Sequence, residues 1–416
     1  MSKIKNHKII NDPIYGFITL DEGIIFDIIE HPYFQRLRRI SQLGLSYLVY
    51  PGAYHTRFHH TIGCVFLINK AIVQIRSKGH NITTEEEEAL KIAILLHDIG
   101  HGPFSHALEN SIVNNISHED ISRFFMQKLN EEFEGKLDLA ISIFNNEYHK
   151  KFLHQLVSSQ LDVDRLDYLK RDSFYTGVTE GNIGTERIIN MLDVVNDELV
   201  VEQKGIYSIE KFLIARRLMY WQVYLHKTVL SVEHTLIKIL SRAKELILLG
   251  NDIFTTTALK TFLSKDYTIK DFMENESLID IFSKLDDYDI YCCIKEWSQH
   301  RDFILSDLSR RIVERDPLKI ITRNKQFTDK EIEILRHQSI KEFNINVKEA
   351  NYLVFTNKVS NNTYHYSKTH INILMKDGSV KDITEASDQF NIEALSKTVN
   401  KYFLCYPTIS TTKRIY

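Results

Sequence analysis

Cysteine is scarce in this chain, with four residues in 416. None of the four has the spacing of a metal site, and an adjacent pair is not the start of a disulfide framework. We therefore expect reduced, partly buried thiols at Cys64, Cys292, Cys293 and Cys405.

The chain also lacks an apolar leader and a long apolar run. Residues 1–11 are polar and basic, without the apolar segment of a secretory signal. No later run approaches the roughly 20 apolar residues that cross a bilayer. The sequence therefore predicts a cytoplasmic protein with no membrane partner.

A global excess of positive charge is absent as well. The 52 lysines and arginines against 55 acidic residues give a formal net charge of −3. This balance does not indicate a dedicated nucleic-acid binder, although it leaves nucleic acid open as a partner. A polyanionic substrate would have to meet a local group of cations. No internal repeat, low-complexity tract or Walker-type glycine loop is present.

Helical periodicity fills most of the chain. Its length exceeds what one hydrophobic core usually serves, and Ser208 to Gly250 contains no proline or internal glycine, which predicts one or two long helices. Alternating residues at 9–20 predict a hairpin, and beyond about residue 320 the pattern changes to strands at 352–359 and 371–383 with a helix at 392–400. We predict a mainly α fold, with a helical core and N-terminal hairpin at residues 1–320 and a small α+β domain at 321–416.

Residues 97–106 concentrate candidate metal ligands and proton carriers. They read His-Asp-Ile-Gly-His-Gly-Pro-Phe-Ser-His and follow a segment, 85–96, with helical apolar spacing. Two glycines and a proline must break this helix. The bend is expected to bring together His97, Asp98, His101 and His106.

This donor set suits a transition metal. Imidazole nitrogen with carboxylate oxygen fits iron, manganese, zinc or cobalt, and the absence of a nearby cysteine argues against a thiolate site. A core histidine beside a helix-terminal aspartate is the simpler interpretation of the His-Asp pair alone. Four candidates within ten residues favour a functional site.

Three other segments could complete such a site. Arg57-Phe58-His59-His60 opens a helix, so its arginine and last histidine can face a metal and an anion together. In the charged helix at 162–172, Asp164, Tyr168 and Asp172 share one side. Arg216, Tyr220, Tyr224 and Lys227 form a stripe that could clamp phosphate. A solvated salt-bridged helix and a half-buried amphipathic face are the alternatives for the last two segments.

Taken together, these segments carry a family resemblance. Arg57-Phe58-His59-His60, His97-Asp98 and Asp162-Val163-Asp164 reproduce the H…HD…D signature of HD-domain metal-dependent phosphohydrolases. With Ile10–Pro13, Phe34–Arg38 and the whole 97–106 string, the chain resembles the deoxynucleoside triphosphate triphosphohydrolases over roughly residues 8–320. We expect no SAM domain before that region.

The resemblance implies an all-helical core that binds one divalent metal, iron, manganese or zinc, with magnesium as a candidate companion of the nucleotide. The implied ligands are His60, His97, Asp98 and Asp164. It implies His106 as the general acid for the departing 5′ oxygen, supported by Glu109 where relatives often carry aspartate. His101 and His118 match histidines that contact the α-phosphate.

It also implies a substrate site and an activator site. Arg57, Arg165 and Arg216 match cations around a triphosphate, and Arg165 replaces a lysine. Gln42 and Leu43 match residues at the base edge, and Asp172 matches the residue at the 3′-hydroxyl. Tyr168, Tyr220 and Tyr224 match residues that line the sugar and base, although Tyr220 replaces a histidine. Positions for an activating GTP or dNTP between subunits are Lys8, Ile9, Glu30, Arg38, His226, Lys227, Arg315 and Lys319, of which Glu30 replaces an aspartate. A homo-oligomer, dimer or tetramer, is therefore expected.

Three functions remain in competition. The first is hydrolysis of a dNTP to the deoxynucleoside and inorganic triphosphate, with nucleotide activation. The second is an HD phosphodiesterase or nucleotidase acting on another nucleotide, a cyclic dinucleotide, an alarmone or a monophosphate. Three clamping arginines would be excessive for a monophosphate. The third is a catalytically silent module that binds nucleotide or nucleic acid, in which loss of metal ligands would be expected.

Overall fold

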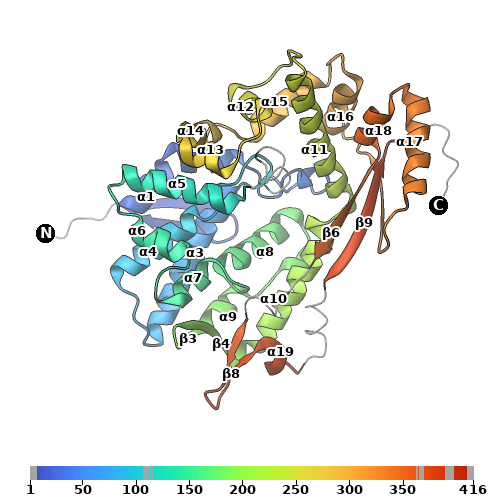
Figure 1. The fold of residues 1–416 in the computed structure, drawn as a ribbon. Helices are drawn as coiled ribbons and strands as arrows, with labels where there is room; N and C mark the ends of the chain where they lie inside the picture. Colours follow the sequence, from blue (N-terminus) through green and yellow to red (C-terminus); the bar gives the residue numbers. More distant parts are fainter. Residues whose placement is uncertain are drawn as a thin grey trace.

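The computed structural model describes residues 7–105, 113, 116–361, 364, 370–388 and 398–409. Helices dominate this part of the chain (Figure 1), which confirms the predicted mainly α fold. The helices of the first half are α1 Ile24–Glu30, α2 Pro32–Gln35, η1 Arg36–Arg39, η2 Ser46–Leu48, α3 Arg57–Ser77, α4 Thr84–Leu96, α5 His118–Glu132, α6 Asp138–Phe144, α7 Lys151–Val157, α8 Val163–Thr176, η4 Thr179–Gly181 and α9 Thr185–Asn190. Those of the second half are η5 Gln203–Gly205, α10 Ile206–Met219, η6 Tyr220–Tyr224, α11 Lys227–Leu248, α12 Thr257–Ser264, α13 Ile269–Glu274, α14 Ser277–Phe282, α15 Asp287–Trp297, α16 Phe303–Val313, α17 Asp329–Phe343, α18 Val347–Leu353 and α19 Ile383–Ala386.

Helix α3 lies in the core. It packs against α4 and α8, and most of its own residues are buried, among them Ile62, Val65 and Ile68. By length and composition alone α3 could also cross a membrane, a feature that the sequence analysis did not anticipate. About 67% of its apolar window is buried inside the protein, as in the core helix of a globular domain.

Local capping fixes where the site-bearing helices begin. Thr83 caps α4 and pairs with Glu86 in a capping box, and Ser117 caps α5 in the same way with Asp120. Asp162 accepts the backbone N–H of Arg165 at the start of α8. These short-range bonds satisfy the free N–H groups of a first helical turn, so the sequence alone sets these boundaries.

The predicted helical stretch at 208–250 divides into α10 and α11 around a π-helical turn, η6. Figure 1 shows α8 and α10 running through the middle of the molecule, between the α3–α4 side and the C-terminal strands. A π-turn widens a helix by one residue and is frequent at functional sites. The sequence did not reveal it.

Three small sheets occur in the described chain. The N-terminal hairpin is confirmed as β1 His7–Asp12 paired with β2 Gly16–Asp21. β3 Leu192–Val195 and β4 Glu198–Glu202 were not predicted, and they join β7 Asn372–Leu374 and β8 Val380–Asp382 in one sheet through a parallel β4–β7 pair. The third sheet has the order β5 Lys319–Arg323, β9 Val399–Tyr406, β6 Phe355–Asn361.

The C-terminal segment is α+β, as expected, and a turn with Gly378 at positive φ joins β7 to β8. The predicted helix at 392–400 falls mostly outside the described residues, and its last two positions are wrong because residues 399 and 400 begin β9. The division at residue 320 stays a prediction. Strand β7 nevertheless pairs with β4 across that division, so the two segments share a sheet.

Candidate metal centre and its cavity

Four candidate ligands converge from three helices. His60 lies in the first turn of α3, His97 caps the end of α4, Asp98 follows it, and Asp164 lies in the first turn of α8. His60 Nε2 is 3.0 Å from Asp164 Oδ1 and 3.5 Å from Asp98 Oδ2. His97 Nε2 is 3.5 Å from Asp98 Oδ1 and 3.7 Å from Asp164 Oδ1.

These distances fit one shared ion. Ligand atoms that each lie about 2.0–2.2 Å from a metal stand roughly 3 Å apart. His97 Nε2 is buried and has no hydrogen-bond partner among the described residues, whereas its Nδ1 is paired with the Ile94 carbonyl at 2.6 Å. A free imidazole nitrogen aimed at two carboxylates is the donor set that a divalent transition metal requires.

Charge is concentrated at this point. Burial alone would raise the pKa of Asp164, but the neighbouring imidazoles of His60 and His97 hold it well below its ordinary value. Burial likewise opposes ionisation of Asp98, whose pKa is lowered by Arg57, His97 and His101. Two carboxylates therefore keep their negative charge in a largely buried place, which favours a bound cation.

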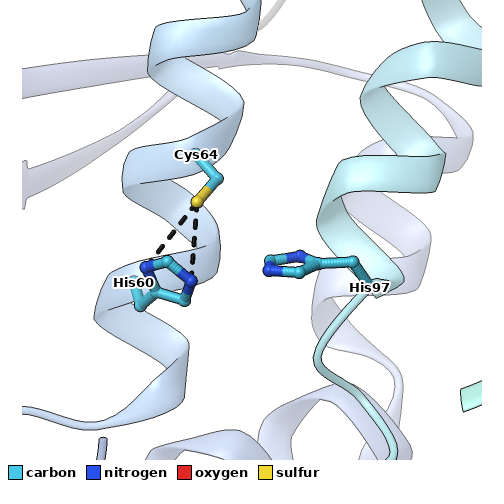
Figure 2. A group of neighbouring side chains, drawn as sticks. All are labelled: His60, Cys64 and His97. Carbon is cyan, nitrogen blue, oxygen red and sulfur yellow. Dashed lines mark hydrogen bonds between the residues drawn. The ribbon is translucent and has the colours of Figure 1, made fainter. Parts of the chain in front are cut away.

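Cys64 lies beside the same histidines, so the expectation that no cysteine is nearby is wrong (Figure 2). Its Sγ is 3.6 Å from Nδ1 and 3.7 Å from Nε2 of His60, and His97 faces the pair from α4. One helical turn separates Cys64 from His60, and this i, i+4 spacing was the signal that sequence reasoning overlooked. Burial raises the pKa of the Cys64 thiol, and a protonated thiol is a poorer ligand than the two carboxylates.

A second group of polar side chains adjoins the centre. His101 Nε2 is 3.3 Å from Asp98 Oδ1, and the rings of His101 and His118 stack with centroids 3.9 Å apart. By spacing, Asp98, His101 and His118 could hold a second ion. Arg57 already faces Asp98, with its NH1 2.5 Å from Oδ2. Burial and Arg57 lower the pKa of His101, so its ring is neutral at neutral pH and Arg57 supplies the positive charge beside Asp98.

The loop after the His-Asp pair is held in an unusual backbone conformation. Phe104 and Ser105 both have φ of 54°, a left-handed region that bulky residues rarely adopt. Phe104 N donates to Asp287 Oδ1 at 2.7 Å, while Asp287 Oδ2 accepts the N–H of Ser41 at 2.8 Å. Burial raises the pKa of Asp287 to about 6. The residue after Ser105 is the predicted general acid His106. It lies outside the described residues, as does Glu109.

A cavity of about 590 Å³ opens from the metal centre. It is within the size range of small-molecule sites. The predicted site residues that line it are Gln42, Leu43, Arg57, His97, Asp98, His101, His118, Asp164, Arg165, Tyr168, Asp172, Tyr220 and Tyr224. Two others do not line it: His60 is fully buried behind the carboxylates, and Arg216 donates from NH1 to Gln160 Oε1 at 3.1 Å.

Aromatic side chains form one wall of the cavity. The Tyr224 ring lies 5.1 Å from that of Tyr220 and 6.1 Å from that of Tyr168, edge to face in both cases. Tyr224 donates its hydroxyl to Asp172 Oδ2 at 2.7 Å, and His55 Nε2 is 2.7 Å from Asp172 Oδ1. Sequence reasoning missed His55, because 117 residues separate it from its partner. The pair holds Asp172 in place against the wall.

Two further cavity residues carry charge. Arg165 forms an ion pair with Asp162, three residues before it on α8, and this pairing raises the guanidinium pKa although burial opposes it. Glu233 of α11 also lines the cavity and was not predicted. Burial raises its pKa to about 8, so the side chain is largely protonated at neutral pH.

The predicted activator residues make separate local contacts. Lys8 lies over the Phe26 ring at 3.7 Å, and Arg38 lies over the Phe58 ring at 3.5 Å. His226 caps α11 by accepting the Thr228 N–H at 3.3 Å. Arg315 donates to the Leu48 carbonyl at 2.9 Å. Ile9, Glu30, Lys227 and Lys319 are exposed. A shared site between subunits stays a prediction.

Comparison with known proteins agrees with this geometry. Residues 57–172 match the HD domain and residues 183–291 the HD associated region. A solved structure of a phosphohydrolase from Bacteroides thetaiotaomicron is 53% identical with a TM-score of 0.94, and the match covers 97% of this chain and 100% of that one.

Two curated relatives extend the comparison. Uncharacterized protein YwfO of Bacillus subtilis is 35% identical over 329 residues, which are 77% of this chain and 73% of that protein. The deoxynucleoside triphosphate triphosphohydrolase SAMHD1 homolog of Dictyostelium discoideum is 31% identical over 271 residues, which are 61% of this chain and 52% of that protein.

Proposed function

Since the chain belongs to the HD-domain phosphohydrolase family, we propose that it hydrolyses deoxynucleoside triphosphates to the deoxynucleoside and inorganic triphosphate. The observation that carries the proposal is the cavity. It extends from the four-ligand metal centre past Arg57 and Arg165 to the wall formed by Tyr168, Tyr220 and Tyr224. The name of the Dictyostelium relative supports the same substrate class, over 52% of that protein's length.

The proposed metal ligands are His60, His97, Asp98 and Asp164. A divalent ion bound there polarises a phosphoryl oxygen and lowers the pKa of a coordinated water. Iron, manganese and zinc all suit nitrogen and oxygen donors. Asp98 and Asp164 would supply negative charge to the ion. His60 and His97 would each face it with Nε2, because their Nδ1 atoms already pair with Asp167 and with the Ile94 carbonyl.

The chain's own residues bind and orient the phosphates in this proposal. Arg57, fixed by its bond to Ser105 Oγ at 2.9 Å, and the stacked pair His101 and His118 contact the α-phosphate. Arg165 exchanges its contact with Asp162 for a more distal phosphate, since guanidinium binds phosphate oxygens in pairs. His106 protonates the 5′ oxygen, because imidazole titrates near neutral pH.

The tyrosine wall selects the sugar. Tyr168, Tyr220 and Tyr224 leave little room for a 2′-hydroxyl, and Asp172 accepts the 3′-hydroxyl, while Gln42 and Leu43 meet the base edge. A ribonucleotide is disfavoured when its extra hydroxyl meets a packed wall. The proposal includes activation by GTP or a dNTP between subunits of a homo-oligomer.

The test incubates the protein, loaded with manganese or iron, with each dNTP alone and then with GTP or a second dNTP. Ion-exchange chromatography separates the products. We expect deoxynucleoside and intact triphosphate, absent for Asp164→Ala and present for Asp307→Asn, whose carboxylate lies on α16 outside the cavity. Mass photometry with and without nucleotide tests assembly, and an unchanged mass contradicts it.

Other products would select other functions. Pyrophosphate or single phosphates would move the attack away from the α-phosphorus and favour a phosphodiesterase or nucleotidase. Two ions per chain would support that outcome, because Asp98, His101 and His118 lie within 4.8 Å of one another and two-metal sites cleave phosphoesters. Bound nucleotide with no turnover would favour a sensing module.

A further inference from the structure

A buried chain of charged side chains leads away from the metal centre. His60 Nδ1 is 2.7 Å from Asp167 Oδ2. Arg171 binds the same carboxylate with two donors, Nε at 2.8 Å and NH2 at 3.0 Å. Its third nitrogen, NH1, donates to Asp12 Oδ2 at 2.7 Å. The residues are His60, Asp167 and Arg171, each 0% exposed, and Asp12, 3% exposed.

The chain ends in the N-terminal hairpin. Asp12 Oδ1 accepts the backbone N–H groups of Ile14 at 2.9 Å and Tyr15 at 3.0 Å, which closes the turn between β1 and β2. One carboxylate therefore shapes the hairpin with one oxygen and holds Arg171 with the other. The Tyr15 ring also lies beside Arg171, with its centroid 5.7 Å from the guanidinium carbon.

Helix α3 leaves no space for these side chains to move. A Cβ atom at Gly63 would lie 2.2 Å from Arg171 NH2 and 2.2 Å from Asp167 Oδ1. The Asp167–Arg171 pair thus rests directly on the α3 backbone, one turn beyond His60. This close approach requires glycine at that position and fixes the carboxylate behind the imidazole.

The charges of the chain favour a metal at the other face of the ring. Asp12 and Asp167 carry two negative charges and Arg171 one positive charge, so a neutral His60 has net negative charge behind it. A carboxylate that accepts the ring N–H of a metal-binding histidine fixes its tautomer and raises its basicity, and removing such a partner typically costs 10–100-fold in metal affinity.

We propose that Asp167, Arg171 and Asp12 are positioning residues for the metal ligand His60, and that through them the N-terminal hairpin is a structural part of the metal centre. The inference rests on the ligand role of His60 in the proposed function. It requires no particular substrate.

The experiment measures metal affinity without nucleotide, by titration of the metal-free protein with Mn²⁺ and by visible absorption of the Co²⁺ form. Asp167→Asn should bind metal about 10–100-fold more weakly, and Asp12→Asn several-fold more weakly, with an altered Co²⁺ spectrum in both. The matched control is Asp307→Asn, because Asp307 and Arg311 form the same i, i+4 pair on α16, with Nε 2.7 Å from Oδ2.

Each outcome decides a different point. Wild-type affinity and spectrum in both Asp167→Asn and Asp12→Asn overturn the proposal. Equal losses in Asp307→Asn overturn it too, since they point to general destabilisation. If Asp167→Asn does not fold, Asp12→Asn decides, because an asparagine still closes the turn through its Oδ1. Undiminished binding in His60→Ala refutes the ligand assignment itself, whereas failure of dNTP hydrolysis leaves the metal measurements intact.

Discussion

Replacement of Gly100 by alanine should displace helix α5 from the metal centre. The added Cβ atom would lie 2.1 Å from the His118 carbonyl oxygen and 2.4 Å from the Ser122 backbone nitrogen. Cβ atoms do not approach closer than 3.0 Å. Both obstacles are backbone atoms, so no rotamer change relieves the contact, and the first turn of α5 must move by about 1 Å.

The cost follows from the contacts at this point. Overpacking of a buried contact costs about 1–3 kcal/mol. Two hydrogen bonds through Ser122 Oγ, from the Gly100 N–H and to the His97 carbonyl, both 2.9 Å, weaken at about 1 kcal/mol each. We expect a loss of about 3–5 kcal/mol in unfolding free energy. Because His118 begins α5, its ring leaves the 3.9 Å stack with His101, and a 1 Å misplacement costs about 100-fold in rate.

The assay combines urea unfolding with the rate of nucleotide hydrolysis. Gly102→Ala is the control, since a Cβ atom there would meet Phe282 Cζ at 3.5 Å, an ordinary van der Waals contact. Neither glycine has a positive φ, so both substitutions leave the backbone unstrained. Equal stability and equal rates in the two variants would refute the steric reasoning.

Three other outcomes are expected. Glu233→Gln should remove a pH dependence: the folded-state pKa near 8 lies above the ordinary 4.5, so the folded state holds the proton and stability falls as pH rises between these values. From pH 6 to pH 9 wild type should lose up to about 3 kcal/mol more than the variant in urea unfolding, and parallel curves would contradict this. Removal of the metal by a chelator should lower the melting temperature of the wild-type protein, and Mn²⁺ should restore it. The melting temperature of Asp164→Ala should respond to neither, and equal responses in the two proteins would disprove the ligand role of Asp164. Tyr224→Phe should cost about 1.5–3 kcal/mol in thermal unfolding, because Asp172 loses a 2.7 Å hydrogen bond, and an unchanged melting temperature would show that water replaces the hydroxyl.

Much of the fold was accessible from the sequence because its determinants are local. Capping pairs such as Ser117 with Asp120 are three residues apart, and apolar spacing over 85–96 marks a helix without knowledge of its neighbours. Strands β3 and β4 escaped because only four and five residues form them, and β4 pairs with a strand about 170 residues later.

The candidate site was likewise predictable where its determinants are local and not where they depend on contacts between distant residues. The sequence by itself determined which residue types could hold a metal, and the order of His60, His97, Asp98 and Asp164, because ligand chemistry belongs to the side chains. Only the tertiary structure decided what supports them. Asp12 meets Arg171 across 159 residues, and Glu233 is largely protonated at neutral pH because packing buries it. Contacts between distant residues and the loss of solvent are properties of the packed chain, so no local pattern encodes them.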